Sequence, residues 1–228
     1  METDSSLLSF AENELQIFAL LFMAAVYALK IRWILRFPAG RDRQPPGGKG
    51  AAGARQGALH SLFNVALPWE MASTRARPWF YAQFVVFHVG VAASIVMSFL
   101  IPYAPQWMAG RVAVAALQAI FGAATLVGAI RMARRIVNPY IRGISTPDDY
   151  FSLALLVVWL AFSLLAAPND RAHGEFALLV YFCLTAFFLI YVPFSKISHY
   201  LYYPFARWYL GKTLGYRGVY PVRAGGRA

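Results

Sequence analysis

The sequence is poor in cysteine and in charged residues. Of its 228 residues, one is a cysteine, Cys183, and 14% are charged. A single cysteine excludes a disulfide within the chain. Acidic residues are outnumbered, ten to 21, by lysine and arginine, yet several of them lie at the very start of the sequence. A cleavable signal peptide would carry basic residues there, so we expect none.

Apolar residues make up 59% of the sequence, which is too much for one soluble core. They gather in stretches long enough to cross the hydrocarbon core of a bilayer as helices. We therefore predict an all-α membrane protein, a bundle of five transmembrane helices. The predicted spans are at about 15–35, 79–101, 112–130, 150–167 and 176–203.

The polar segments predict how the spans are arranged. An N-terminal tail, 1–14, precedes the transmembrane domain, 15–207, and a second tail, 208–228, follows it. Loop 36–78 contains a Pro/Gly-rich stretch, 45–53, that we expect to be a flexible linker. This loop, the loop after the third span and the last tail are basic, which places the N-terminus outside and the C-terminus in the cytoplasm. The net charge of +11 thus belongs to loops and indicates no nucleic-acid site.

Two local patterns in the sequence indicate where a helix starts and which helix packs closely. Asp148 and Asp149 directly precede the fourth span, where a helix dipole favours negative charge. The third span is rich in alanine and glycine, which is typical of membrane helices that pack closely.

The sequence has four histidines, and two of them lie in spans. His60 and His173 lie in predicted loops, and we expect both to be solvated without a special role. His88 follows the start of the second span, and His199 precedes the end of the fifth. Counted at about 1.5 Å per residue from the cytoplasmic ends of their spans, the two imidazoles have similar depths.

Two imidazoles at one depth on antiparallel helices could bind the two faces of a haem iron. Small residues next to them would leave room for the ring: Gly90, Ala92, Ala93 and Ser195. Four cations near the cytoplasmic interface could contact the haem propionates: Lys196, Arg207, Arg75 and Arg77. From spacing alone, a structural polar pair and a transport or proton-relay role stay open as alternatives. Covalent c-type haem is excluded, because the sequence has no C-x-x-C-H motif.

Several motifs resemble the gamma subunit of respiratory nitrate reductases. They are Phe-His-Val-Gly-Val at 87–91, the segments 134–139 and 146–153, and Pro-Phe-Ser-Lys-x-x-His at 193–199. The last motif is the most specific, and the family carries arginine or lysine at the position of Lys196. The likeness extends over about 79–207 and includes the number of spans and their orientation.

The resemblance implies a cytochrome b subunit of the cytoplasmic (inner) membrane. Such subunits pass electrons between the quinone pool and a cytoplasmic iron–sulfur or other redox subunit, and are not catalytic alone. The family holds two haems, each bound by histidines of spans two and five. His88 and His199 match the pair nearer the cytoplasm, whereas Ser98 and Tyr181 occupy the positions of the other pair. We therefore expect one haem b and no second haem.

The missing outer pair leaves the use of quinone open. Quinone would bind near the single haem, or in the outer space around Ser98 and Tyr181, or not at all; we favour the first. A haem-free membrane anchor or assembly subunit is the alternative function. A small transporter is poorly supported, because no span pairs acidic and basic residues at its centre.

Overall fold

The computed structural model describes residues 6–38, 40, 43–47, 50–172 and 174–220, and all regular secondary structure within them is helical. The chain forms two compact units. The first combines Met1–Lys30 with Ala82–Ile197, and the second combines Ile31–Tyr81 with Ser198–Ala228.

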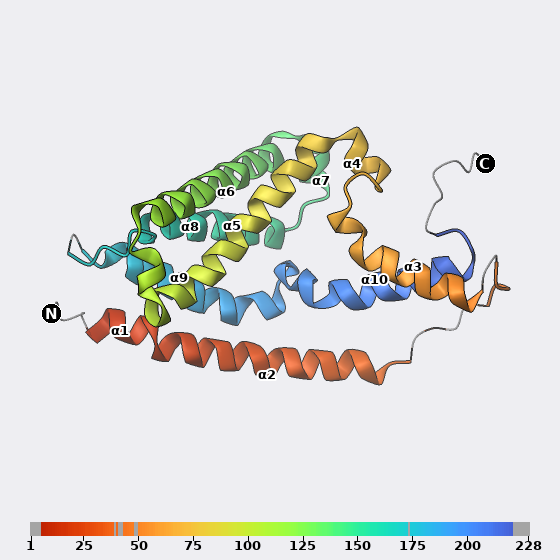
Figure 1. Ribbon diagram of the computed structural model, residues 1–228, viewed down its shortest axis with the longest axis horizontal. Helices are drawn as coiled ribbons and strands as arrows, with labels where there is room; N and C mark the ends of the chain where they lie inside the picture. The colour runs from red at the N-terminus through yellow and green to blue at the C-terminus, as the bar shows by residue number, and fades with distance from the viewer. Residues whose placement is uncertain (1–5, 39, 41–42, 48–49, 173, 221–228) are drawn as a thin grey trace. The chain divides into compact units, whose positions relative to one another are not determined.

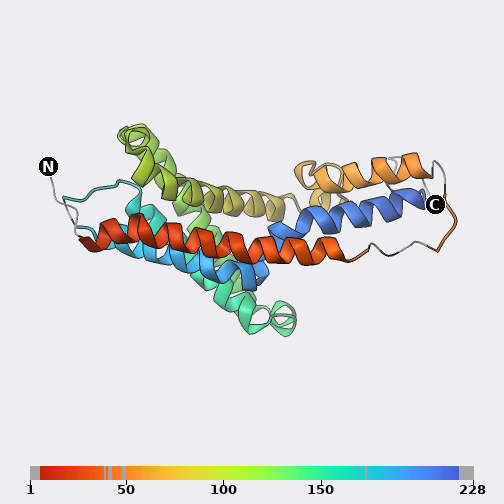
Figure 2. The same cartoon turned by 90° about the horizontal axis from the view of Figure 1, so that it is seen from below.

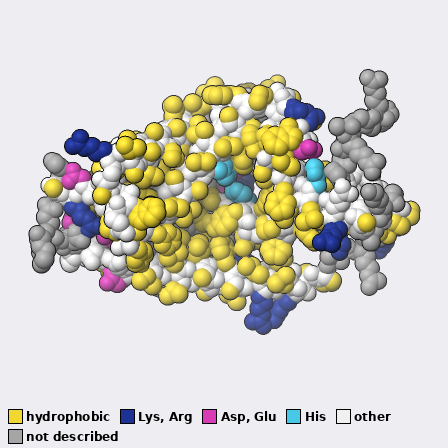
Figure 3. All heavy atoms as spheres, in the orientation of Figure 1, with side chains coloured by type: hydrophobic (Ala, Val, Ile, Leu, Met, Phe, Trp, Pro, Cys, Tyr) yellow, Lys and Arg dark blue, Asp and Glu magenta, His cyan; other side chains and the backbone are white. Residues whose placement is uncertain are grey.

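Five stretches of the described residues are long and apolar enough to cross a membrane, as predicted. They are Ser6–Arg36, Pro78–Tyr103, Arg111–Val137, Pro147–Ala166 and Phe176–Phe194. Many of their large hydrophobic side chains are exposed, and hydrophobic side chains cover most of the face shown in Figure 3. Exposed apolar side chains of this kind suit lipid. The chain is therefore a multi-pass, all-α membrane protein.

The first unit is built from antiparallel helices with short connections (Figures 1 and 2). Helix α6 lies against α8, α8 against α9, and α1 against α9. The long helices are α6 (Arg111–Val137), α8 (Pro147–Ala166) and α9 (Phe176–Tyr191), together with most of α2 (Glu14–Arg36) and of α5 (Pro78–Tyr103). The short helix α1 (Ser6–Glu12) precedes α2. The short helices η2 (Pro105–Met108) and α7 (Pro139–Gly143) lie in the connections.

Polar side chains inside this unit bond one helix to another. The hydroxyls of Ser94 on α5 and Ser163 on α8 are 2.6 Å apart. Trp159 Nε1 on α8 donates to Thr185 Oγ1 on α9 at 2.9 Å. An unpaired polar group costs several kcal/mol in hydrocarbon, so each of these bonds fixes how the helices face one another.

From Ser6 on, the chain is helical, so the described part of the predicted N-terminal tail, 1–14, forms helix. Helix α1 begins at Ser6, and the apolar stretch runs from there to Arg36, instead of starting at residue 15. Glu12, almost fully buried, pairs with Arg171 of the loop between α8 and α9 at 3.0 Å. The start of the first span and this loop therefore lie at the same end of the unit, as the four spans between them require.

The last span is shorter than predicted, because its helix breaks. Helix α9 ends at Tyr191, two short 3₁₀ turns follow (η3, Val192–Phe194, and η4, Lys196–Ser198), and α10 (His199–Tyr216) starts anew. Pro193 lacks an N–H and its ring clashes with the preceding turn, while Ser195 is extended (φ −101°, ψ 171°). The predicted span 176–203 is thus not one helix.

The second unit pairs α3 (Ala51–Phe63) with α10 side by side and antiparallel (Figure 1). Glycines bring the two backbones together: a Cβ at Gly57 would lie 2.4 Å from the carbonyl oxygen of Gly211. Helix α3 begins inside the stretch that we expected to be a flexible linker, so loop 36–78 is partly helical. It also contains η1 (Asn64–Ala66) and α4 (Ala72–Ala76). Residues 39, 41, 42, 48 and 49 of this loop lie outside the described residues.

Close packing of α5 on α6 depends on Gly90. A Cβ at Gly90 would lie 2.2 Å from the Cβ of Ala124, whereas one at Gly122 would meet nothing within 4 Å. We expect Gly90→Ala to destabilise the protein by about 1–3 kcal/mol through overpacking. The matched control Gly122→Ala should be neutral or stabilising by up to about 1 kcal/mol. Unfolding in mixed micelles measures both, and equal stabilities would contradict this packing.

Candidate functional site

His88 lies in α5, and a hydrogen bond within its own helix orients its ring. Its Nδ1 is 2.8 Å from the carbonyl oxygen of Phe84, one turn earlier. A carbonyl can only accept, so Nδ1 carries the hydrogen and the lone pair is on Nε2. This is the tautomer of a metal-ligating histidine, whose second ring nitrogen commonly donates to a backbone carbonyl.

The imidazole is on an exposed face of its helix. His88 and Ala92, one turn later, are both exposed, and the ring of Phe84 is 4.1 Å from that of His88, tilted by 42°. Gly90 has a different role from the one predicted. It is buried against Ala124, so it serves helix packing and leaves no room for a ring. The donor chemistry at His88 fits haem iron, and the small neighbour on its face is Ala92.

His199 is the first residue of α10 and is exposed. The break before it separates His199 from Tyr181, so the two residues lie on different helices and not on one helix over the predicted span 176–203. Ser195 is not a small neighbour on the ligand face either. Its hydroxyl donates to the carbonyl of Val192 and accepts from the N–H of Ile197, within the break. His88 and His199 belong to different units, so their pairing stays a prediction.

Three of the four predicted propionate contacts have partners within the protein. Lys196 Nζ lies 2.8 Å from Asp149 Oδ2. Arg207 donates to the carbonyl of Ser61 at 3.0 Å and to the side chain of Asn64.

The two arginines before the second span differ from each other. Arg75 donates to the carbonyl of Trp69. Arg77 is exposed at the end of α4. Contacts of all four cations with haem propionates stay predictions.

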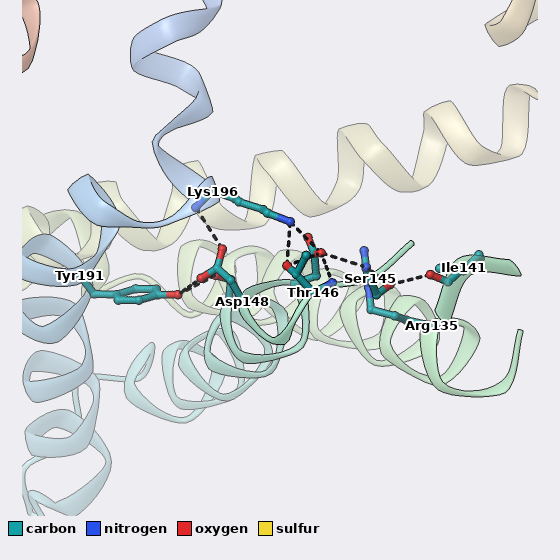
Figure 4. Close-up of polar contacts among 9 residues, drawn as sticks. Arg135, Ile141, Ser145, Thr146, Asp148, Tyr191 and Lys196 are labelled. Atoms are coloured by element: carbon teal, nitrogen blue, oxygen red, sulfur yellow. Dashed lines mark hydrogen bonds and ion pairs between the residues drawn. The ribbon is translucent and has the colours of Figure 1, made fainter. Parts of the chain in front are cut away.

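A polar cluster at the start of α8 is the feature that sequence reasoning missed (Figure 4). Thr146 and Asp149 form a capping box, with Asp149 Oδ2 accepting from the Thr146 N–H at 2.8 Å. Asp148 accepts from the hydroxyl of Tyr191 and from the backbone N–H of Lys196. The sequence did predict the acidic start of this helix. It gave no sign that the two carboxylates bond to the end of the last span.

The position of the missing outer ligands is filled by side chains. Tyr181 is fully buried, and its hydroxyl donates to the carbonyl of Ser94 at 2.6 Å. Its ring is stacked with that of Trp159, at 6.4 Å and 8°. Ser98 donates to the carbonyl of Ile95, within its own helix. Tyr181 thus holds α9 directly against α5 at this level.

Of the two remaining histidines, one is described, and it lies in a helix where the sequence predicted a loop. His60 lies in α3, where its ring is 5.0 Å from that of Tyr220, and His173 lies outside the described residues. Elsewhere in the described part of the chain, no three His, Cys, Asp or Glu side chains gather to hold a metal ion.

Comparison with known proteins gives a distant relative. No protein-family model matches the chain. A protein of Nitratidesulfovibrio vulgaris (strain Hildenborough) is 27% identical over 184 residues, which cover 75% of this chain and 74% of that protein. The relative is described simply as a protein, so the likeness extends over most of both chains and adds no activity.

Restoring two histidines at the outer position should not create a second haem site. We expect the double variant Ser98→His, Tyr181→His to bind no more haem than the parent, because the helices there are only one side chain apart. The variant should also be less stable, since it loses the bond from Tyr181 to Ser94. The haem-to-protein ratio by pyridine haemochrome checks this, and an added haem would contradict it.

Proposed function

We propose that this chain is a haem b-containing membrane-anchor subunit of a respiratory redox complex. It passes electrons between the quinone pool and a cytoplasmic iron–sulfur or other redox subunit. His88 and His199 are the axial ligands of one haem b in the cytoplasmic (inner) membrane, with the C-terminus in the cytoplasm. The motifs at 87–91 and 193–199, on a protein with the expected number of spans, support this proposal.

The observation that carries it is the state of His88. An imidazole in an apolar span is costly, and such residues are functional by default. His88 is exposed in an apolar span, Pro78–Tyr103, and its Nδ1 is oriented by a backbone carbonyl. With the hydrogen of the neutral ring on Nδ1, the lone pair is on Nε2, a nitrogen that can bind iron.

In this function the chain binds and orients a cofactor and converts no substrate itself. Bound haem b supplies one-electron transfer. The protein supplies two imidazoles, apolar surroundings that exclude water, and an anchorage for the partner subunit. We place quinone near this haem, since Tyr181, buried against α5, fills the outer position where quinone was the other option.

A haem-free anchor or assembly subunit is the second candidate. It is favoured by the bonds of Lys196 and Arg207, which engage protein groups in place of propionates. Haem content separates the two candidates directly.

Substitution of either ligand should abolish haem binding without preventing membrane insertion. We expect His88→Ala and His199→Ala each to lose the low-spin b-type spectrum, because one imidazole cannot provide bis-axial ligation. Insertion should survive, since the apolar spans drive it. His60→Ala is the matched control and should keep the wild-type spectrum. The measurement is a dithionite-reduced spectrum of each purified variant.

Retention of a full low-spin spectrum in either variant would remove that histidine from the ligand set. Absence of haem from the wild-type protein, purified folded and with haem supplied, would favour the second candidate.

A further inference from the structure

The break between α9 and α10 is held by groups from other helices. A break leaves backbone groups without helical partners, and such groups must be bonded elsewhere in an apolar setting. On one side of the break, Lys30 of α2 donates to the carbonyl of Pro193 and lies over the ring of Phe194. On the other side, the partners come from the first turn of α8.

Lys196 is bonded through both its backbone and its side chain to the first turn of α8 and to the residue that caps it. Its N–H donates to Asp148 Oδ2 at 3.2 Å, and its Nζ bonds to Asp149 Oδ2 and Thr146 Oγ1, each at 2.8 Å. Figure 4 shows the lysine lying across the helix start, with its backbone nitrogen over Asp148 and its ammonium group beside Thr146. Two attachment points fix both the position of the chain and its direction.

Further contacts keep the two aspartates in place. Asp148 also accepts from Tyr191, the last residue of α9, and from Ser152 on α8 at 3.2 Å. Asp149 belongs to the capping box, and Arg135 of α6 lies 3.9 Å from it. Groups of α6, α8 and α9 therefore orient the two carboxylates in addition to Lys196. An isolated ion pair with a lysine this exposed would contribute little, but here it is one bond of a network.

One member of this network, Lys196, lies three residues before His199, a proposed haem ligand. Only Ile197 and Ser198, in the single turn η4, separate Lys196 from His199, so displacement of Lys196 displaces the start of α10. We propose that Asp148 and Asp149 are positioning residues: they clamp the break at Lys196 and thereby hold His199 where it binds haem iron. This inference rests on the proposed function. It changes the role predicted for Lys196, from a contact with a haem propionate to a residue that joins the break to α8.

The first experiment compares haem binding in full-length variants. Lys196→Met and Asp149→Asn should each lose part of the bound haem and broaden the low-spin ferric EPR signal of the rest. Their double variant should be no worse than either alone, because both remove the same bond. Lys196→Arg should restore the wild-type signal, and Lys212→Met, an exposed lysine of α10, is the control.

Two results of this experiment would overturn the proposal. Haem signals as in wild type for both single variants would show that the clamp does not position His199. A changed signal in Lys196→Met alone, with Asp148→Asn and Asp149→Asn unchanged, would show that Lys196 acts on the haem directly.

The second experiment needs no haem. A lysine-specific protease should cut after Lys196 several-fold faster in Asp148→Asn and Asp149→Asn than in wild type, because the break opens more often. Asp170→Asn, in the loop between α8 and α9, is the control, and the protease should cut it at the wild-type rate. Equal rates in all variants would overturn the clamp. Wild-type protein without haem would overturn the proposed function, while this cleavage would still show whether the aspartates hold the break.

Discussion

The structure depends on one constraint, the cost of leaving a polar group unpaired in hydrocarbon. Within the spans, side-chain bonds such as Trp159 to Thr185 and Tyr181 to Ser94 join helices that apolar packing alone would let slide. The same constraint governs the break before α10, where Asp148 and Lys30 bond to freed backbone groups. His88 obeys it through the carbonyl of Phe84. Polar residues such as Trp159 and Tyr181 thus mark joints between helices, and His88 marks the proposed site.

Hydrophobic length predicted the five spans, and the acidic pair in the first turn of α8 was recognised from the helix dipole. The sequence did not reveal the break after Tyr191, because Pro193 in an apolar run also occurs in kinked, continuous helices. It did not reveal α3 either. A Gly/Ala-rich stretch is typical of a linker, and it becomes a helix here because glycines of α10 let the two backbones approach. Such long-range pairing leaves no local signal.

The candidate site was predicted in part. The positions of His88 and His199 came from spacing and from the resemblance, and the orientation of the His88 ring agrees with a ligand. The roles of its neighbours were wrong, since Gly90 packs against Ala124 and Ser195 belongs to the break. Charge near an interface suggested that Lys196 and Arg207 serve a cofactor. Both also have protein partners, which charge counting cannot foresee, and their contacts with propionates stay predictions.

One haem b, bound by a single pair of imidazoles, is central to the proposed function. The most direct test is the haem-to-chain ratio of the purified full-length protein, measured by pyridine haemochrome with a dithionite-reduced spectrum. We expect one haem b per chain. A ratio of two would show that the packed position around Tyr181 still accepts a haem, and a ratio of zero in folded, haem-supplied protein would contradict the proposed function.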